Sequence, residues 1–415
     1  MKERRVVITG MGSVSCGGNS VDALWNTLIH GRSGIAPLTL FDVSGMPVRF
    51  GGEVRDLELQ NVNKKEERRF ARYTRFAVAA AHEAMTQAGL GPHDPALDLY
   101  RCGVLAASGS GGLEVLEKNI IACANRGASG VSAFYIPTFI SNNASGILGI
   151  RYGFKGCNFS AASACASGAH GLGEAFWMIK RGDADVMLAG GSEACITPSL
   201  LSGFAALTAL STRNDDPQGA SRPFDKNRDG FVFSEGAGLL VLEELEHARK
   251  RGAEILAEFA GYGATCDAYH ITAPDPAGDG IARAMKTAMR HGGCVPEEVG
   301  HIAAHGTATK ANDVSECRAI RSVFGTHADH IAVNSIKSMI GHTIGASGPI
   351  GAISAIQTLR TGIVPPTINC TDQDPECDLD VTALDAKQIE TEYAIVNSLG
   401  FGGHNTALLF RRWKE

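Results

Sequence analysis

The sequence predicts an α/β fold, and two observations support that prediction. Short apolar or β-branched runs alternate along the chain with longer segments of helical periodicity, a pattern typical of strands buried between layers of helices. Hydrophobic residues make up 44% and charged residues 20% of the 415 residues, as in ordinary globular proteins. At roughly 150 residues per domain, this length predicts two or three units or one large duplicated fold.

The apolar runs define the expected strands. We expect strands at residues 5–9, 104–107, 186–189, 238–242, 302–304, 331–334 and 394–397. The helical periodicity predicts helices at 69–88, 166–181, 280–291 and 350–360. The first and third of these helices end near glycine, which commonly terminates a helix.

A weak internal similarity links the two halves of the chain. Residues 160–173 and 333–355 each contain a turn rich in glycine and serine followed by a helix of small residues. The charged stretch 246–252 follows a predicted strand, so we place the division there, between an N-terminal half at 1–250 and a C-terminal half at 251–415. Because no flexible linker separates the halves, we expect them to share one core.

Charge and apolar patterning exclude several classes. The net charge of -6 argues against a nucleic-acid-binding surface. No apolar run reaches the roughly 18 residues of a membrane span, and the apolar stretch after the N-terminal charges is too short for a signal peptide. We therefore expect a cytoplasmic protein. The eleven cysteines include no Cys-x-x-Cys pair, which disfavours a disulfide framework and a zinc site.

Common ligand motifs fail on inspection. Gly10 and Gly12 resemble a dinucleotide-binding turn, but Ser15 stands where the third glycine is needed. Asp225 begins a sequence like a calcium loop, but Gly236 occupies its twelfth position, where a glutamate would bind the ion. There is also no Gly-x-Ser-x-Gly elbow and no phosphate-binding Gly-Lys-Ser/Thr loop.

Cys165 is the strongest candidate nucleophile. It lies in a run of small residues at 160–170 that leads into a predicted helix. The dipole and free N–H groups at a helix N-terminus stabilise a thiolate. Two later segments supply candidate partners, since His305 follows a predicted strand, and Lys337 and His342 follow the next one. Spacing alone does not bring these residues together.

Four motifs together resemble one known family. They are Ala-Cys-Ala-Ser-Gly around Cys165, His-Gly-Thr at His305, Lys-Ser-x-x-Gly-His from Lys337 to His342, and Gly-Phe-Gly-Gly around Phe401. In this order they resemble the β-ketoacyl-[acyl-carrier-protein] synthases of the thiolase superfamily, and most closely the elongating type, ketosynthase II. The similarity extends over essentially the whole chain.

The resemblance implies both a fold and a reaction. The fold would be a thiolase-like, duplicated five-layer α-β-α-β-α arrangement, usually a homodimer. The enzyme would be an acyltransferase that carries out a decarboxylating Claisen condensation in fatty acid chain elongation. It would join an acyl group to malonyl-acyl carrier protein and release carbon dioxide. Its substrates would be carried on the phosphopantetheine arm of acyl carrier protein, with no cofactor and no metal.

The same resemblance assigns roles to individual residues. Cys165 would carry the acyl group, and the backbone N–H groups of Cys165 and Phe401 would form the oxyanion hole, with Phe401 and Gly402 in the gating loop. His305 and His342 would stabilise the enolate. Lys337, paired with Glu316, would orient His305.

A basic surface is expected at the carrier-protein site. Lys65, Arg68, Arg69 and Arg72 follow helical spacing and predict one basic helix face. By itself such a face is most often only solvated. The resemblance makes Lys65, Arg68 and Arg69, together with Arg126, the expected contacts of acyl carrier protein.

Some positions depart from the family pattern. Ser110 stands where elongating relatives commonly have a bulkier residue that gates the acyl pocket, while His404 and Thr343 alter two loops beside the site. These changes leave open a specialised polyketide, polyene or nodulation-type pathway, with a chain-length-factor partner as an alternative to a homodimer. The presence of Cys165 argues against a non-catalytic chain-length factor, and the two histidines argue against a thiolase with its second catalytic cysteine.

Overall fold

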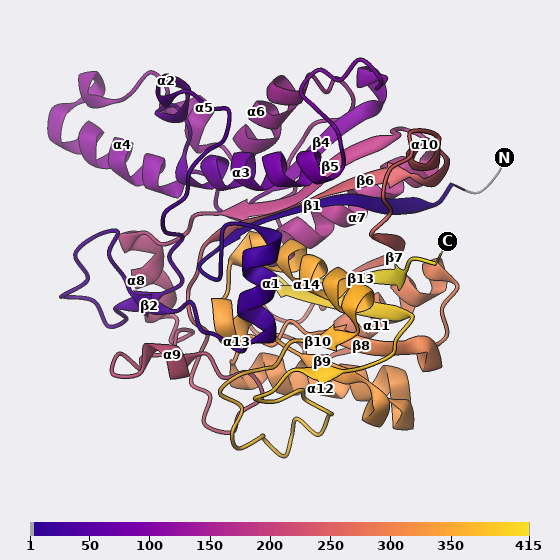
Figure 1. The fold of residues 1–415 in the computed structure, drawn as a ribbon. Helices are drawn as coiled ribbons and strands as arrows, with labels where there is room; N and C mark the ends of the chain where they lie inside the picture. The colour runs from indigo at the N-terminus through magenta and orange to yellow at the C-terminus, as the bar shows by residue number, and fades with distance from the viewer. Residues whose placement is uncertain (1–3, 415) are drawn as a thin grey trace.

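The computed structural model describes residues 4–414, and within that range the central element is a nine-stranded mixed sheet (Figure 1). Its strand order is β4-β5-β6-β1-β7-β13-β12-β8-β9. The strands are β1 (Val6–Ser15), β4 (Cys102–Ala107), β5 (Val186–Glu193), β6 (Gly236–Glu244), β7 (Ala257–Cys266), β8 (Val299–Ala303), β9 (Ala332–Asn334), β12 (Tyr393–Gly400) and β13 (His404–Arg412).

The sheet contains the same arrangement of four strands twice. In the first, β4 and β5 are parallel, while β5 pairs antiparallel with β6, and β6 with β1. In the second, β8 and β12 are parallel, while β12 pairs antiparallel with β13, and β13 with β7. The two sets meet where Val6–Ile8 of β1 pairs with β7. The order and direction of the strands are therefore repeated.

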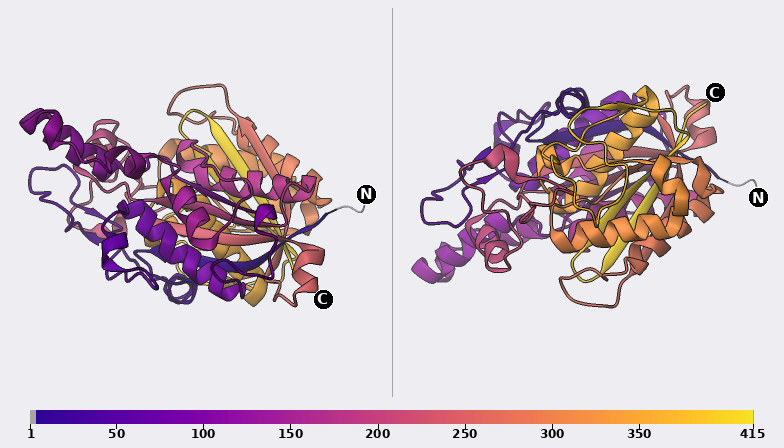
Figure 2. Two further views of the ribbon diagram at one scale, coloured as in Figure 1. Left: turned by 90° about the horizontal axis from the view of Figure 1, so that it is seen from above. Right: turned by 90° about the horizontal axis from the view of Figure 1, so that it is seen from below.

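Helices complete five layers (Figures 1 and 2). The two central helices, α7 (Ser167–Arg181) and α14 (Ser347–Thr361), lie between the two parts of the sheet and pack against both. On the outside, α3 (Arg72–Gln87) and α6 (Asn143–Tyr152) cover one part. On the opposite side, α11 (Asp279–Gly292) covers the other part, and α12 (Lys310–Phe324) packs on α11. This is the α-β-α-β-α arrangement that the resemblance implied.

Glycines in β1 and β7 allow the outer helices to approach the sheet closely. A Cβ on Gly12 would lie 1.9 Å from the Ala80 carbonyl oxygen of α3, and a Cβ on Gly263 would lie 2.0 Å from the Ala284 carbonyl oxygen of α11. The first predicted strand, 5–9, consequently ends too early. Gly10 and Gly12 do not turn the chain, and β1 continues to Ser15.

The remaining helices lie mostly at the surface or around the site, and all but α4 are short. They are α1 (Val21–Ile29), α2 (Lys64–Glu67), α4 (Leu113–Arg126), α5 (Tyr135–Phe139), α8 (Pro198–Ala206), α9 (Pro217–Ala220), α10 (Leu245–Lys250) and α13 (Lys337–Ile340). No helix in the part of the chain that the structure describes is long and apolar enough to cross a membrane.

The predicted helix at 69–88 begins later than expected. Ala71 has extended backbone angles, and α3 starts at Arg72, whose N–H donates to a carboxylate oxygen of Glu114 at 2.6 Å. Before it, Lys64–Glu67 forms the separate short helix α2, and Arg68 and Arg69 follow α2 in a turn. The four basic residues 65, 68, 69 and 72 therefore do not lie on one continuous helix.

Candidate active site

A cavity of about 600 Å³ brings together four residues that are distant in the sequence. Cys165 lies in the 3-10 turn that precedes α7, and His305 follows β8. His342 follows α13, and Phe401 follows β12. The imidazole rings of His305 and His342 are edge to face, with centroids 5.3 Å apart. The two histidines and the cysteine thus line one cavity.

The turn that carries Cys165 has a counterpart in the second half of the chain. Ala164, directly before Cys165, has a φ of 50°, and Ile344 has a φ of 46° at the start of the turn before α14. Both are non-glycine residues in a left-handed conformation that is rarely adopted. Gly345 therefore occupies the place that Cys165 occupies in the first half.

The two turns differ in what lies beside their backbone N–H groups. β12 ends at Gly400, where a Cβ would lie only 3.3 Å from the Cys165 nitrogen. β5 ends at Glu193, whose carboxylate accepts the Gly345 N–H at 3.0 Å. Glycine at the end of β12 consequently keeps the space beside the Cys165 N–H open for an oxyanion.

Burial determines the protonation state of Cys165. Its side chain is buried, and loss of hydration raises the pKa of the thiol to about 12. The Lys337 charge and the backbone N–H groups of Phe401 and Cys165 act in the opposite direction and lower this pKa, but they do not outweigh burial. Burial therefore opposes the thiolate stabilisation that the helix N-terminus is expected to provide, while the N–H groups of Phe401 and Cys165 lie beside the sulfur.

Lys337 and Glu316 hold the backbone of His305 from two directions. The Lys337 ammonium donates to the His305 carbonyl oxygen at 2.6 Å. The Glu316 carboxylate accepts the N–H of His305 at 2.8 Å and that of Gly306 at 2.9 Å. The two side chains make no direct hydrogen bond or close ion pair with each other, so the expected pairing is replaced by two separate contacts with the same short segment.

The charge on Lys337 is sensitive to pH. Burial lowers the pKa of its ammonium to about 8, although the negative charge of Glu316 acts to raise this pKa. Burial also raises the pKa of Glu316, whose carboxylate is stabilised by the two N–H groups above and by Asn397. Lys337 is thus a buried cation whose charge is lost in mildly alkaline solution.

Both histidines are neutral near pH 7. Burial and the Lys337 charge hold the pKa of His305 and that of His342 well below their ordinary value. Ser347 Oγ lies 2.9 Å from His342 Nδ1 and accepts the Thr343 N–H at 3.1 Å. Thr343 Oγ1 also lies 3.1 Å from Ser347 Oγ. Donation from the Ser347 hydroxyl to Nδ1 would place the His342 proton on Nε2, the tautomer that the expected enolate contact requires.

Two other expected site residues lie outside this arrangement. Ser110 does not line the cavity, and Glu193 accepts hydrogen bonds from its N–H and from its hydroxyl. Gly402 lies beside Phe401, but its N–H donates to the Ile271 carbonyl oxygen at 2.8 Å. Gly402 therefore anchors the loop that carries Phe401 and has no free N–H to offer an oxyanion.

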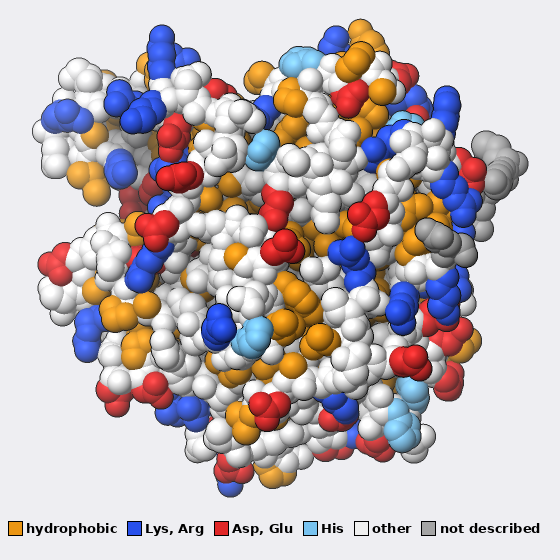
Figure 3. Space-filling view, viewed as in Figure 1, with side chains coloured by type: hydrophobic (Ala, Val, Ile, Leu, Met, Phe, Trp, Pro, Cys, Tyr) orange, Lys and Arg blue, Asp and Glu red, His pale blue; other side chains and the backbone are white. Residues whose placement is uncertain are grey.

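All of the expected basic residues except Arg72 form an exposed surface. Lys65, Arg68, Arg69 and Arg126 are all exposed. Figure 3 shows basic side chains gathered at the upper left, over the region of α2, α4 and α5. Arg72 instead forms an ion pair with Glu235, whose side chain is fully buried. The expectation that Arg72 belongs to the basic face is wrong, because its guanidinium turns inward to this carboxylate.

Sequence reasoning missed several residues that shape the site. Ser347 contacts His342, Asn397 contacts Glu316, and Thr307 lines the cavity. Each lies within or close to a recognised segment: Ser347 follows His342 by five positions, and Thr307 belongs to His-Gly-Thr. Their proximity to the motifs was the available signal, although their contacts depend on the folded structure.

Comparison with known proteins identifies the family. Residues 3–248 match the family model of the β-ketoacyl synthase N-terminal domain, and residues 256–371 match that of the C-terminal domain. The chain belongs to the β-ketoacyl synthase family. This finding confirms the predicted family and enzyme class, an acyltransferase.

Individual similarities to this β-ketoacyl synthase extend over full chains. It is 48% identical to the 3-oxoacyl-[acyl-carrier-protein] synthase 2 of Synechocystis, covering 100% of this chain and 99% of the relative. A type II polyketide ketosynthase solved with its acyl carrier protein is 34% identical, with a TM-score of 0.92 and full coverage of both chains. The ishigamide ketosynthase/chain length factor is 33% identical, with a TM-score of 0.91, covering 99% of this chain and 100% of that one. These neighbours also confirm the thiolase-like fold.

Proposed function

We propose that this β-ketoacyl synthase condenses an acyl group held on Cys165 with malonyl-acyl carrier protein, and so elongates fatty acids by two carbons. The observation that carries the proposal is the shared cavity, in which a buried thiol, two neutral imidazoles and the free N–H groups of an oxyanion hole meet. The name of the Synechocystis relative favours fatty acid elongation over a specialised pathway.

The first step transfers the acyl group. The Cys165 sulfur attacks the thioester carbonyl of the acyl carrier protein, and the N–H groups of Cys165 and Phe401 stabilise the tetrahedral oxyanion. The carrier thiolate leaves and takes up the proton given up by Cys165. The products of this step are the acyl-enzyme and the free carrier thiol.

The second step forms the new carbon–carbon bond. Malonyl-acyl carrier protein loses carbon dioxide, and its thioester oxygen becomes an enolate that accepts hydrogen bonds from the neutral imidazoles of His305 and His342. The enolate carbon attacks the acyl thioester, and the Cys165 thiolate leaves and takes a proton from solvent. Lys337 and Glu316 orient His305 through its backbone.

The halves 1–250 and 251–415 contribute different groups to this chemistry in the proposal. The first would supply Cys165, and the second His305, His342 and Lys337. The repeated strand order supports this division. Ser110 would lie near the end of the acyl pocket, since Glu193 contacts both Ser110 and Gly345.

Acyl carrier protein would dock on the exposed basic surface. Lys65, Arg68, Arg69 and Arg126 form a cationic region suited to an acidic partner. Its substrates would arrive on the phosphopantetheine arm, with no further cofactor. A cytoplasmic location remains a prediction from the sequence alone.

A homodimer is the assembly that we propose. Segment 156–159 pairs with the outer edge of β4, and its own outer side includes the exposed Cys157 and the partly exposed Phe159. Large apolar side chains are also exposed nearby in sequence, including Ile120, Ile121, Phe134 and Ile136. Unpaired strand edges and exposed apolar side chains favour association. A chain-length-factor partner is the alternative.

The proposed reaction is tested by the intact mass of the carrier-protein products. Octanoyl and malonyl acyl carrier proteins are incubated with the protein and, in parallel, with the Cys165→Ala variant. We expect a β-keto product extended by two carbons with the unmodified protein and none with the variant. An extended product formed equally by Cys165→Ala would contradict the role of this thiol.

A further inference from the structure

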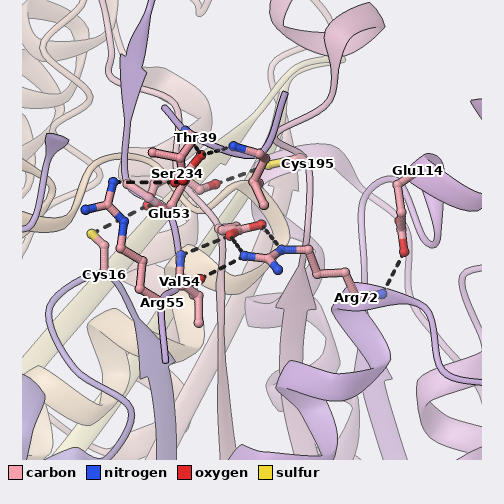
Figure 4. A network of polar contacts seen from close by, with 12 residues as sticks. Cys16, Thr39, Glu53, Val54, Arg55, Arg72, Glu114, Cys195 and Ser234 are labelled. Atoms are coloured by element: carbon pink, nitrogen blue, oxygen red, sulfur yellow. Dashed lines mark hydrogen bonds and ion pairs between the residues drawn. The ribbon is translucent and has the colours of Figure 1, made fainter. Parts of the chain in front are cut away.

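The half-buried Arg72 guanidinium forms an ion pair with the fully buried Glu235 carboxylate, within the polar network drawn in Figure 4. Arg72 Nε donates to Glu235 at 2.9 Å, and a terminal nitrogen of Arg72 contacts the other carboxylate oxygen. The same guanidinium donates to the Val54 carbonyl oxygen at 2.8 Å, and Glu235 accepts the Val54 N–H at 2.9 Å. Two parallel hydrogen bonds to a planar guanidinium fix both position and orientation.

On its outer side, the Arg72–Glu235 pair is linked to α2 and α4, the two helices of the basic surface. Arg72 is the first residue of α3 and follows Arg69 by three positions. An ion pair of 2.5 Å between Arg75 and Glu67 ties α3 to α2. The Arg72 N–H donates to Glu114 in the first turn of α4, and Arg126 is the last residue of that helix. Arg72 is therefore linked to α4 directly and to α2 through the first turn of α3.

On its inner side, the pair is connected to His342. Glu235 directly follows Ser234, whose N–H donates to the His342 carbonyl oxygen at 3.1 Å. The His342 N–H donates to the Val232 carbonyl oxygen at 2.7 Å. The Phe231 ring also packs edge to face on the His342 imidazole, with centroids 5.3 Å apart. Segment 231–234 thus fixes the backbone and the ring of His342.

We propose that Arg72 and Glu235 are positioning residues that couple docking of acyl carrier protein to the placement of His342. The inference rests on the proposed function. A carrier protein bound over Arg68 and Arg69 displaces the start of α3, and the rigid Arg72–Glu235 pair transmits the displacement to segment 231–234. Small errors in the placement of a catalytic group are costly to rate, so the pair would change turnover more than carrier-protein affinity.

The chain provides a closely matched control. Arg251 forms two hydrogen bonds of 2.7 Å with Glu243, whose side chain is also fully buried, and it donates to the Ala88 carbonyl oxygen. Glu243 lies near the far end of β6, which begins directly after Glu235. Arg251→Lys therefore weakens a similar pair, which contacts the C-terminal end of α3 at Ala88 but not the start of α3 or His342.

The experiment compares Arg72→Lys with Arg251→Lys in malonyl decarboxylation. Each variant receives malonyl-acyl carrier protein and, separately, malonyl-pantetheine, which has no carrier protein. We expect Arg72→Lys to lower kcat about tenfold with the carrier-protein substrate, while KM for that substrate and turnover of malonyl-pantetheine stay within twofold. Arg251→Lys should leave the ratio of the two substrates unchanged. Equal losses on both substrates in Arg72→Lys would overturn the coupling.

A second measurement needs no variant. It tests the coupling between docking and His342 even if Arg72→Lys does not fold. Amide hydrogen exchange is followed at 231–235 and at His342 in the unmodified protein, with and without carrier protein lacking an acyl group. The proposal expects altered exchange in these amides on docking, and unaltered exchange would overturn it. If the unmodified protein does not decarboxylate malonyl-acyl carrier protein at all, the proposed function has failed instead.

Discussion

The ammonium of Lys337 donates to the carbonyl oxygen of His305 at 2.6 Å, so a buried cation directly supports the backbone of an expected catalytic residue. Burial raises the pKa of the Cys165 thiol and lowers those of both imidazoles, and the Lys337 charge acts to lower the pKa of all three groups. Because burial lowers the pKa of Lys337 to about 8, the Lys337 charge and its electrostatic effects depend on pH within an accessible range.

We expect malonyl decarboxylation to decline as pH rises through about 8, when Lys337 loses its charge. No change is expected between about pH 7 and pH 8 from the histidines, which are already neutral there. The rate of carbon dioxide release, measured as a function of pH, shows this alkaline decline. The Lys337→Met variant should be slow at every pH and show no such decline. An unmodified enzyme with constant activity from pH 7 to pH 9.5 would contradict the prediction.

The same pKa shift predicts the opposite trend in stability. Between about pH 8 and pH 10.4, the usual pKa of lysine, the unfolded chain binds a proton at Lys337 that the folded chain does not. Where the unfolded state binds more protons, stability rises with pH. We expect Lys337→Met to remove this contribution in urea unfolding experiments across that range. An identical pH dependence in both proteins would argue against a lowered pKa.

Alkylation should report the neutral state of Cys165. With a thiol pKa of about 12, the reactive thiolate fraction rises about tenfold for each pH unit, because only the thiolate is nucleophilic. We expect iodoacetamide inactivation to accelerate in this way from pH 7 to pH 10 without a plateau. Mass analysis alongside Cys165→Ala identifies the modified residue. A plateau below pH 9 would show that the oxyanion donors outweigh burial.

Ser347 should affect catalysis through the His342 tautomer. Ser347→Ala removes the hydrogen bond that holds His342 Nδ1, so the imidazole loses a constraint on its tautomer and orientation, and we expect decarboxylation to fall about tenfold, as for a lost hydrogen bond of about 1.4 kcal/mol. Ser354→Ala is the matched control, because Ser354 is a buried serine of the same helix whose hydroxyl has no hydrogen-bond partner. Similar losses in both variants would point to a packing effect.

Because β1 packs closely on α3, we expect Gly12 to be important for stability. A Cβ at position 12 meets the Ala80 backbone at 1.9 Å, so we expect Gly12→Ala to lower the free energy of unfolding by about 1–3 kcal/mol. Gly203 of α8 has no atom near its Cβ position, and Gly203→Ala should raise stability by about 0.5–1 kcal/mol. Urea unfolding measures both. A neutral Gly12→Ala would mean that α3 can move away without cost.

Long periodic segments were predictable from the sequence, whereas strands of small residues were not. The helix predicted at 280–291 agrees closely with α11, because its apolar positions repeat at helical spacing. Strand β7 was missed because Gly261 and Gly263 interrupt its apolar pattern. These glycines allow α11 to pack closely against the strand. This packing depends on the tertiary structure, so the local sequence pattern does not reveal it. β13 was also missed, although residues 407–410 form an apolar run.

The identity of the site residues was accessible from motifs, but their contacts were not. Cys165, His305 and His342 were named from the sequence, and the fold brings them to one cavity. The inward turn of Arg72 was not predictable, because Glu235 lies 163 positions later. The high pKa of Cys165 was missed for a related reason, since helix position is visible in a sequence, whereas the burial that opposes it depends on the whole fold.

The difference between Gly400 and Glu193 bears on how many acyl groups one polypeptide can carry. The repeated architecture provides two similar turns, but the carboxylate of Glu193 occupies the Gly345 N–H in one of them. Gly345 also has no side chain to carry an acyl group. Of these two turns, only the one with Cys165 has a side chain that could carry an acyl group, so in the proposed reaction saturating the protein with an acyl donor should attach a single equivalent per chain.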